Sequence, residues 1–139
     1  MIRFKSQLQR AQNSQLAQAL EIIHDVKKHG NHITAMLSYN DLIQLGGYAA
    51  VEYCGGPSMI FRMGRHDYDH EDDHTKAIVA HTQSHENSVQ AAMFDTMGLQ
   101  PEEYVALMGS YTIGFANDEN KTKKGRWTMN PYVFDNTYF

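Results

Sequence analysis

Apolar residues recur at helical spacing near the start of the chain, which predicts an amphipathic helix over about Ser14–Lys28. Asn13 or Ser14 can cap the start of this helix, and Gly30 lies just beyond its end. The apolar positions that follow the helical period are Leu16, Leu20, Ile23 and Val26.

A second helix is expected to begin after Ser38. Ser38 and Asp41 form a variant of the capping box, in which Asp41 reaches back toward the helix start. The run from Cys54 to Pro57 ends the helix, because proline cannot continue it. The pair Gly46–Gly47 weakens the middle by roughly 1 kcal/mol per glycine. This pair indicates either close approach of another element or a local kink.

Two further helices are expected in the second half. One covers about Ser84–Met97 and ends before Gly98, and the other begins at Gln100-Pro101, where proline and acids favour a helix start. A polar stretch lies between the second and third helices, and the chain from Phe115 onward has an irregular pattern. Strand signals are sparse, so the fold class is mainly α.

Composition and charge narrow the class of protein. The chain has 139 residues, enough for one domain, and 12 basic against 16 acidic side chains give a net charge of -4. A general nucleic-acid or anionic-membrane binder needs a basic face, so neither partner is expected. The dense basic run at Lys121–Arg126 is interpreted as a solvated loop, with a partner-docking patch as the alternative. No apolar stretch approaches the roughly 20 residues that a transmembrane helix needs.

Localisation signals are few. Cys54 is the only cysteine, so an intrachain disulfide is excluded and a reducing, intracellular compartment fits. The first twenty residues contain Arg3, Lys5 and Arg10 and no acid. This composition is typical either of a basic stretch of the fold or of a mitochondrial targeting segment.

Histidines and carboxylates are concentrated in the segment His66–His74, and such side chains bind first-row metals. No predicted element holds this run in a fixed geometry, so a solvated acidic loop is the simpler interpretation. His81 and His85 are four residues apart and share a helix face, either as a metal pair or as a polar helix entry. No phosphate-binding glycine loop and no CxxC motif is present.

Four stretches occur in an order typical of one known family. They are Ile2–Phe4; Leu37–Gly47 with its continuation at Val51-Glu52, Gly55–Pro57, Gly64-Arg65 and Asp67; Val105–Gly114; and Trp127–Phe139. Together they resemble the plant-type (class I) haem peroxidases, which include ascorbate peroxidase and cytochrome c peroxidase. The resemblance implies a single partial peroxidase-like domain over residues 1–139, with proximal-side helices and irregular loops, covering about half of the family's domain.

The resemblance places Tyr111 where the family carries the histidine that binds haem iron. The family's distal helix would precede Met1, and the aspartate that orients the proximal histidine would follow Phe139. The haem-lining stretch corresponds to Ile78–His81. The positions that bind a haem propionate and ascorbate in the family correspond to Asn117 and Asn120.

Other family positions keep their residue type. Trp127 occupies the position of the proximal tryptophan. A candidate site for potassium or calcium matches the cation loop of ascorbate-type members, because its hydroxyl, carbonyl and carboxylate oxygens suit a hard cation. Turn formation by the same residues is the simpler interpretation. The matching residues are Thr112, Thr128, Asn130, Val133 and Asp135.

These departures predict a pseudo-peroxidase without catalytic residues and without cofactor. We expect an accessory subunit of a larger assembly, in which other protein subunits cover the missing half. The alternative is a divergent peroxidase that reduces hydrogen peroxide with haem b, since tyrosine also ligates ferric haem. In that case either Tyr111 is the axial ligand or another chain supplies the missing half of the fold, and Tyr111 and Trp127 are the haem-binding residues.

Overall fold

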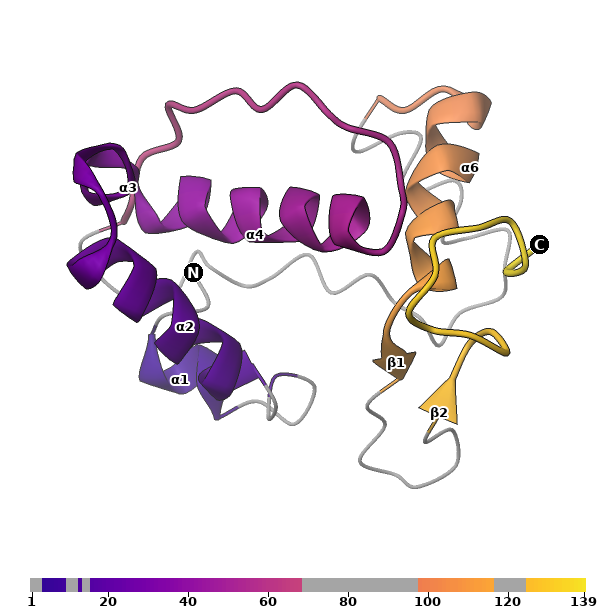
Figure 1. The fold of residues 1–139 in the computed structure, drawn as a ribbon, viewed down its shortest axis with the longest axis horizontal. Coiled ribbons are helices and arrows are strands. Elements are labelled where there is room, and N and C mark those ends of the chain that lie inside the picture. Colours follow the sequence, from indigo (N-terminus) through magenta and orange to yellow (C-terminus); the bar gives the residue numbers. More distant parts are fainter. Residues whose placement is uncertain (1–3, 10–12, 14–15, 69–97, 117–124) are drawn as a thin grey trace.

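The computed structural model describes residues 4–9, 13, 16–68, 98–116 and 125–139, and in these parts the protein is mainly helical (Figure 1). Two short strands pair antiparallel, with Phe115 opposite Arg126. The elements are α1 (Lys5–Leu8), α2 (Leu16–His29), α3 (His32–Met36), α4 (Tyr39–Tyr53), α6 (Pro101–Met108), the 3-10 helix η2 (Gly109–Thr112), β1 (Phe115–Ala116) and β2 (Gly125–Arg126). None of the helices described is both long and apolar enough to cross a membrane.

Helices α2 and α4 confirm the first two helix predictions. The Ser38 hydroxyl caps α4 by accepting a hydrogen bond from Asp41 N at 3.0 Å, as the capping motif predicted. The second half of that prediction was wrong. The Asp41 carboxylate turns away from the helix start and accepts hydrogen bonds from Gly64 N and Arg65 N, because a later segment passes there.

The surroundings of the glycine pair in α4 test whether another element approaches it closely. A Cβ atom on Gly46 would lie 3.6 Å from Cδ1 of Ile23, so α2 approaches α4 at this position. A Cβ atom on Gly47 would meet nothing within 4 Å. Close approach therefore accounts for Gly46 but leaves Gly47 without a packing reason.

The start of α6 confirms the prediction at Gln100-Pro101. Glu103 Oε2 accepts a hydrogen bond from Gln100 N at 2.8 Å, which satisfies a backbone donor at the helix start. The chain then tightens into η2, which carries Tyr111 and Thr112. The expected third helix, Ser84–Met97, lies outside the described residues.

Four short elements were not expected: α1, α3, β1 and β2. Helix α1 and helix α3 are both short, and α3 is capped by Asn31, whose side chain accepts hydrogen bonds from Ile33 N and Thr34 N, each at 3.0 Å. The tail predicted as irregular contains the strand pair β1–β2. Its residues carry no alternating apolar pattern, so sequence periodicity could not indicate the pair.

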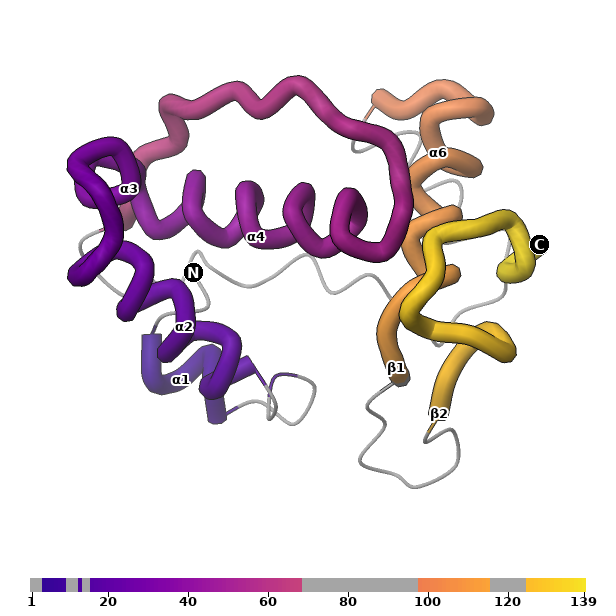
Figure 2. Tube along the Cα trace, viewed as in Figure 1, coloured from indigo at the N-terminus to yellow at the C-terminus, as the bar shows by residue number. Residues whose placement is uncertain are grey.

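The segment after α4 runs back along that helix to its first residues (Figure 2). The return begins at Cys54–Gly56, where Gly55 has a φ of 88°, a left-handed conformation that favours glycine. It reaches Asp67, whose carboxylate accepts hydrogen bonds from Tyr39 N at 2.8 Å and from Asn40 N at 3.1 Å. This path brings residues far apart in sequence to the start of α4.

The apolar interior of the described chain is small. Leu20, Leu37 and Leu42 are its buried apolar side chains, and they come from α2, α4 and the turn between α3 and α4. A groove of about 500 Å³ lies between α2 and α4. Its lining is apolar: Leu16, Ala19, Leu20, Ile22, Ile23, Ile43, Gly46 and Gly47.

Candidate functional site

Tyr111 lies in an aromatic cluster built from η2 and the C-terminal segment. Its ring stacks on Tyr138 with centroids 5.4 Å apart and 20° between the planes. Trp127 meets the same ring edge-on, at 5.3 Å and 85°. The structure therefore brings together Tyr111 and Trp127, the two residues of the predicted proximal site, and adds Tyr138, which sequence analysis missed.

The phenol of Tyr111 faces partly toward solvent. The side chain is 37% exposed, and its hydroxyl makes no hydrogen bond with any residue that the structure describes. Tyr138 is more enclosed. Burial, followed by the Tyr111 and Tyr104 phenols, raises the pKa of Tyr138 above its ordinary value. The Tyr111 hydroxyl is thus the more accessible of the two stacked phenols.

Histidines do not reach this cluster in the described chain. His24, His29 and His32 belong to α2 and α3, and the His66 carbonyl bonds Asn40 at the start of α4. Helix α6, which η2 directly follows, lies at the opposite end of α4 (Figure 1). A haem held by a proximal histidine therefore does not fit the residues described around Tyr111. At the position of the family's proximal histidine, the side chain that could ligate iron is the phenol of Tyr111.

Three of the predicted cation-site residues are joined by hydrogen bonds next to the cluster. Thr112 is fully buried, and its hydroxyl donates to Asp135 Oδ1 at 2.9 Å. Thr128 donates from its hydroxyl to the Thr112 carbonyl at 2.9 Å. Thr137 donates to Asp135 from both its hydroxyl and its N–H. These hydrogen bonds, with the Thr137 hydroxyl the largest influence, lower the pKa of Asp135.

Asn130 and Val133, the other two predicted residues, form a turn in the same loop. Asn130 accepts hydrogen bonds from Val133 N at 3.4 Å through its carbonyl and from Tyr132 N at 3.3 Å through its side chain. Pro131 accepts one from Gly114 N at 2.9 Å, which ties this turn to the end of η2. The oxygen donors suit potassium or calcium. Several of the same oxygen atoms also take part in hydrogen bonds within the loop. A cation site and a hydrogen-bonded turn, the two interpretations from the sequence, therefore both stay open.

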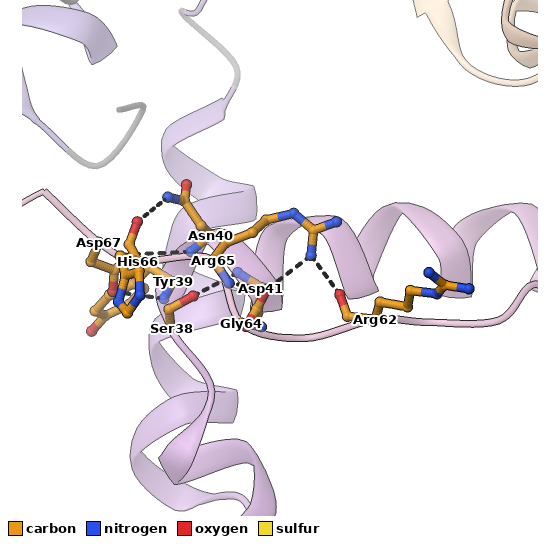
Figure 3. A network of polar contacts seen from close by, with 9 residues as sticks. All are labelled: Ser38, Tyr39, Asn40, Asp41, Arg62, Gly64, Arg65, His66 and Asp67. Carbon is orange, nitrogen blue, oxygen red and sulfur yellow. Dashed lines mark hydrogen bonds and ion pairs between the residues drawn. The ribbon is translucent and has the colours of Figure 1, made fainter.

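A second polar network surrounds Asp41 at the start of α4 (Figure 3). Its carboxylate accepts hydrogen bonds from Gly64 N at 2.8 Å and from Arg65 Nη1 at 2.9 Å. The Gly64 N–H lowers the pKa of Asp41 most, burial opposes this effect, and Arg65 adds to the lowering. Gly64 and Arg65 are 23 and 24 residues from Asp41, and this spacing carries no local sequence signal that predicts the contacts.

His66 and Asp67, at the start of the segment His66–His74, belong to this network. The carbonyl of His66 accepts a hydrogen bond from Asn40 Nδ2 at 2.7 Å, and Asp67 caps α4. Within the described ranges, no three His, Cys, Asp or Glu side chains are grouped to hold a metal. His24 lies on the exposed face of α2 and bonds the Tyr39 hydroxyl through Nδ1 at 2.8 Å.

Several predicted positions lie outside the described residues. They are the rest of the acidic run after Tyr68, the pair His81 and His85, the stretch Ile78–His81, Asn117, Asn120 and the lysines of the basic run.

Comparison with known proteins identifies the class. The family model described as Peroxidase matches residues 1–139, so the chain belongs to the peroxidase family. The resemblance inferred from the sequence motifs is confirmed, as is the mainly helical, partial peroxidase fold.

Individual relatives are plant ascorbate peroxidases. The chain is 40% identical to L-ascorbate peroxidase 5, peroxisomal, of Arabidopsis thaliana, over 99% of this chain and 47% of the relative. It is 34% identical to probable L-ascorbate peroxidase 3, peroxisomal, of Oryza sativa subsp. japonica, over 99% and 45%. It is 36% identical to L-ascorbate peroxidase 2, cytosolic, of the same rice, over 93% and 49%. The chain thus spans about half the length of the curated relatives it matches.

Proposed function

We propose that this chain is a pseudo-peroxidase, in which the Tyr111 cluster has a packing role and the protein acts as an accessory subunit of a larger assembly. The observation that supports this proposal most is the pair of ring contacts that Tyr111 makes with Tyr138 and Trp127. Aromatic pairs of this kind stabilise a fold by about 0.5–1.5 kcal/mol each beyond area burial. The tyrosine at this position is therefore accounted for by packing alone.

Exposed apolar side chains support a protein partner. The groove between α2 and α4 is lined almost entirely by apolar residues, among them Ile22, which is 61% exposed. Apolar surface of this kind is usual at protein interaction sites. A mitochondrial assembly stays a prediction, since the relatives compared above are named peroxisomal or cytosolic.

Haem titration tests the catalytic half of the proposal. The purified chain is mixed with haem b, and absorption spectra and hydrogen peroxide turnover are recorded for wild type, Tyr111→Phe and Tyr111→His. We expect wild type to give the same spectrum as Tyr111→Phe and no turnover above free haem. A Soret band that is lost in Tyr111→Phe, together with turnover in wild type, would contradict the proposal.

The alternative is a divergent haem peroxidase with Tyr111 as axial ligand. The observation that favours it is the exposed phenol of Tyr111, whose oxygen has no described hydrogen-bond partner. Tyrosine ligates haem iron in catalases. The reductant in that case would be ascorbate, as in the names of the relatives. The spectral comparison with Tyr111→Phe separates the two functions directly.

The assembly half has an independent test. The purified chain is examined by sedimentation and by fluorescence of a dye that binds exposed apolar surface. We expect strong dye binding or self-association, because the described apolar groove is open. A chain that is monomeric, unfolds cooperatively and binds no dye would contradict a subunit role while leaving the haem result untouched.

The loop around Thr112 is proposed as a site for potassium or calcium. Oxygen atoms of Thr112, Thr128, Asn130, Val133 and Asp135 would hold the ion. Ion binding to the folded state raises the unfolding midpoint in proportion to the logarithm of ion concentration above Kd. We expect such a rise in wild type and its loss in Thr112→Val. An equal response of both proteins to the ion would mean that the loop is only a turn.

A further inference from the structure

Two tyrosines from distant parts of the sequence lie face to face at the surface. Tyr111 comes from η2 and Tyr138 from the C-terminal segment, and their nearly parallel rings have centroids 5.4 Å apart. The Tyr138 ring also meets Phe139 edge-on at 5.4 Å, and Tyr111 meets Trp127. Each ring is therefore held by a second aromatic contact, which keeps the pair in register.

In a dityrosine, the new bond joins ring carbons next to the hydroxyl groups. The nearly parallel stacking of Tyr111 on Tyr138, with 20° between the ring planes, brings the two ring faces together for such a bond.

We infer that Tyr111 and Tyr138 form an intramolecular dityrosine when the protein meets a one-electron oxidant. Each phenol loses one electron and one proton, giving two tyrosyl radicals. The radicals couple through a carbon–carbon bond between the two rings, and transfer of the two ring protons to the two oxygens, through water, restores both phenols. The overall change is the removal of two hydrogen atoms and the reduction of two equivalents of oxidant. This modification site goes beyond the proposed function.

Solvent access alone predicts a different product. Tyr53 and Tyr132 are 92% and 70% exposed, whereas Tyr111 is only 37% exposed. If encounter in solution governed coupling, these exposed tyrosines would join separate molecules. Proximity of Tyr111 and Tyr138 instead favours a bond within one chain, because neighbouring reactants avoid the entropy cost of association.

The test uses dilute full-length chain and a photogenerated ruthenium(III) complex as the one-electron oxidant. Trypsin cleaves after Lys121 and Arg126, so Tyr111 and Tyr138 fall in separate peptides, residues 77–121 and 127–139. Mass spectrometry then detects the two peptides joined with loss of two hydrogen atoms, and blue dityrosine fluorescence gives the yield. The matched controls Tyr104→Phe and Tyr132→Phe remove the other tyrosines of these peptides.

We expect the joined peptide in monomeric wild type and in both controls, and its loss in Tyr111→Phe and in Tyr138→Phe. Far-UV circular dichroism of each variant checks that it is folded. If a variant does not fold, fragmentation of the wild-type joined peptide assigns the linked residues. The inference is overturned if the joined peptide is absent from wild type, persists without Tyr111, or maps to another pair.

Discussion

Two replacements of Tyr111, by phenylalanine and by leucine, distinguish the contribution of its ring packing to stability from that of its hydroxyl. Tyr111→Phe keeps both ring contacts and removes only a hydroxyl that has no described hydrogen-bond partner. Tyr111→Leu removes both contacts. At about 0.5–1.5 kcal/mol for each aromatic pair, two pairs amount to about 1–3 kcal/mol of unfolding free energy. We therefore expect Tyr111→Phe to match wild type and Tyr111→Leu to be destabilised by that amount.

Urea unfolding measures this difference with a local probe. Trp127 is the only tryptophan and lies 5.3 Å from the Tyr111 ring, so its fluorescence reports on the cluster itself. Circular dichroism follows the helices in the same samples. For a chain of this size, each kcal/mol also lowers Tm by about 2–4 °C. Equal destabilisation by Tyr111→Phe and Tyr111→Leu would refute the packing argument, because it would assign the energy to the hydroxyl.

Three further predictions concern the helices and the network at the start of α4. The lowered pKa of Asp41 means that its carboxylate stabilises the fold fully above the ordinary aspartate pKa, and that this stability is lost as pH falls below roughly 4. Urea midpoints across pH should therefore vary less in Asp41→Asn, whereas Asp25→Asn, at a side chain 80% exposed, should follow wild type. Gly56→Ala should lower the free energy of unfolding by about 1–3 kcal/mol, because its Cβ would lie 2.5 Å from Val51 Cγ1. Gly47→Ala should raise the free energy of unfolding by about 1 kcal/mol, because its Cβ would meet no atom within 4 Å. Thermal unfolding that ranked these two variants the other way would contradict the packing around both glycines. Leu42→Ala, at a side chain 2% exposed, should cost about 2–5 kcal/mol in the same assay, and a loss below 1 kcal/mol would show that the site is not core.

Local signals were sufficient for the helix starts. The Ser38 hydroxyl accepts a hydrogen bond from a backbone N–H in the first turn of α4, and the Glu103 carboxylate accepts one from Gln100 N at the start of α6. The sequence alone therefore indicates both boundaries. Asn31 carries the same kind of signal for α3, which is short and lacks an apolar period, and it was not interpreted as a cap. The four similar stretches along the chain likewise indicated the family, which the family model over residues 1–139 confirms.

Tertiary structure decided which side chains meet. The partners of Asp41 are 23 and 24 residues away, and they reach it only because the segment after α4 returns along that helix. The stacking of Tyr111 on Tyr138 depends in the same way on the path of the C-terminal segment. Sequence therefore determined the helices, their caps and the unusual tyrosine, because those depend on neighbours along the chain. The surroundings of that tyrosine depend on contacts across the fold, which no spacing in the sequence encodes.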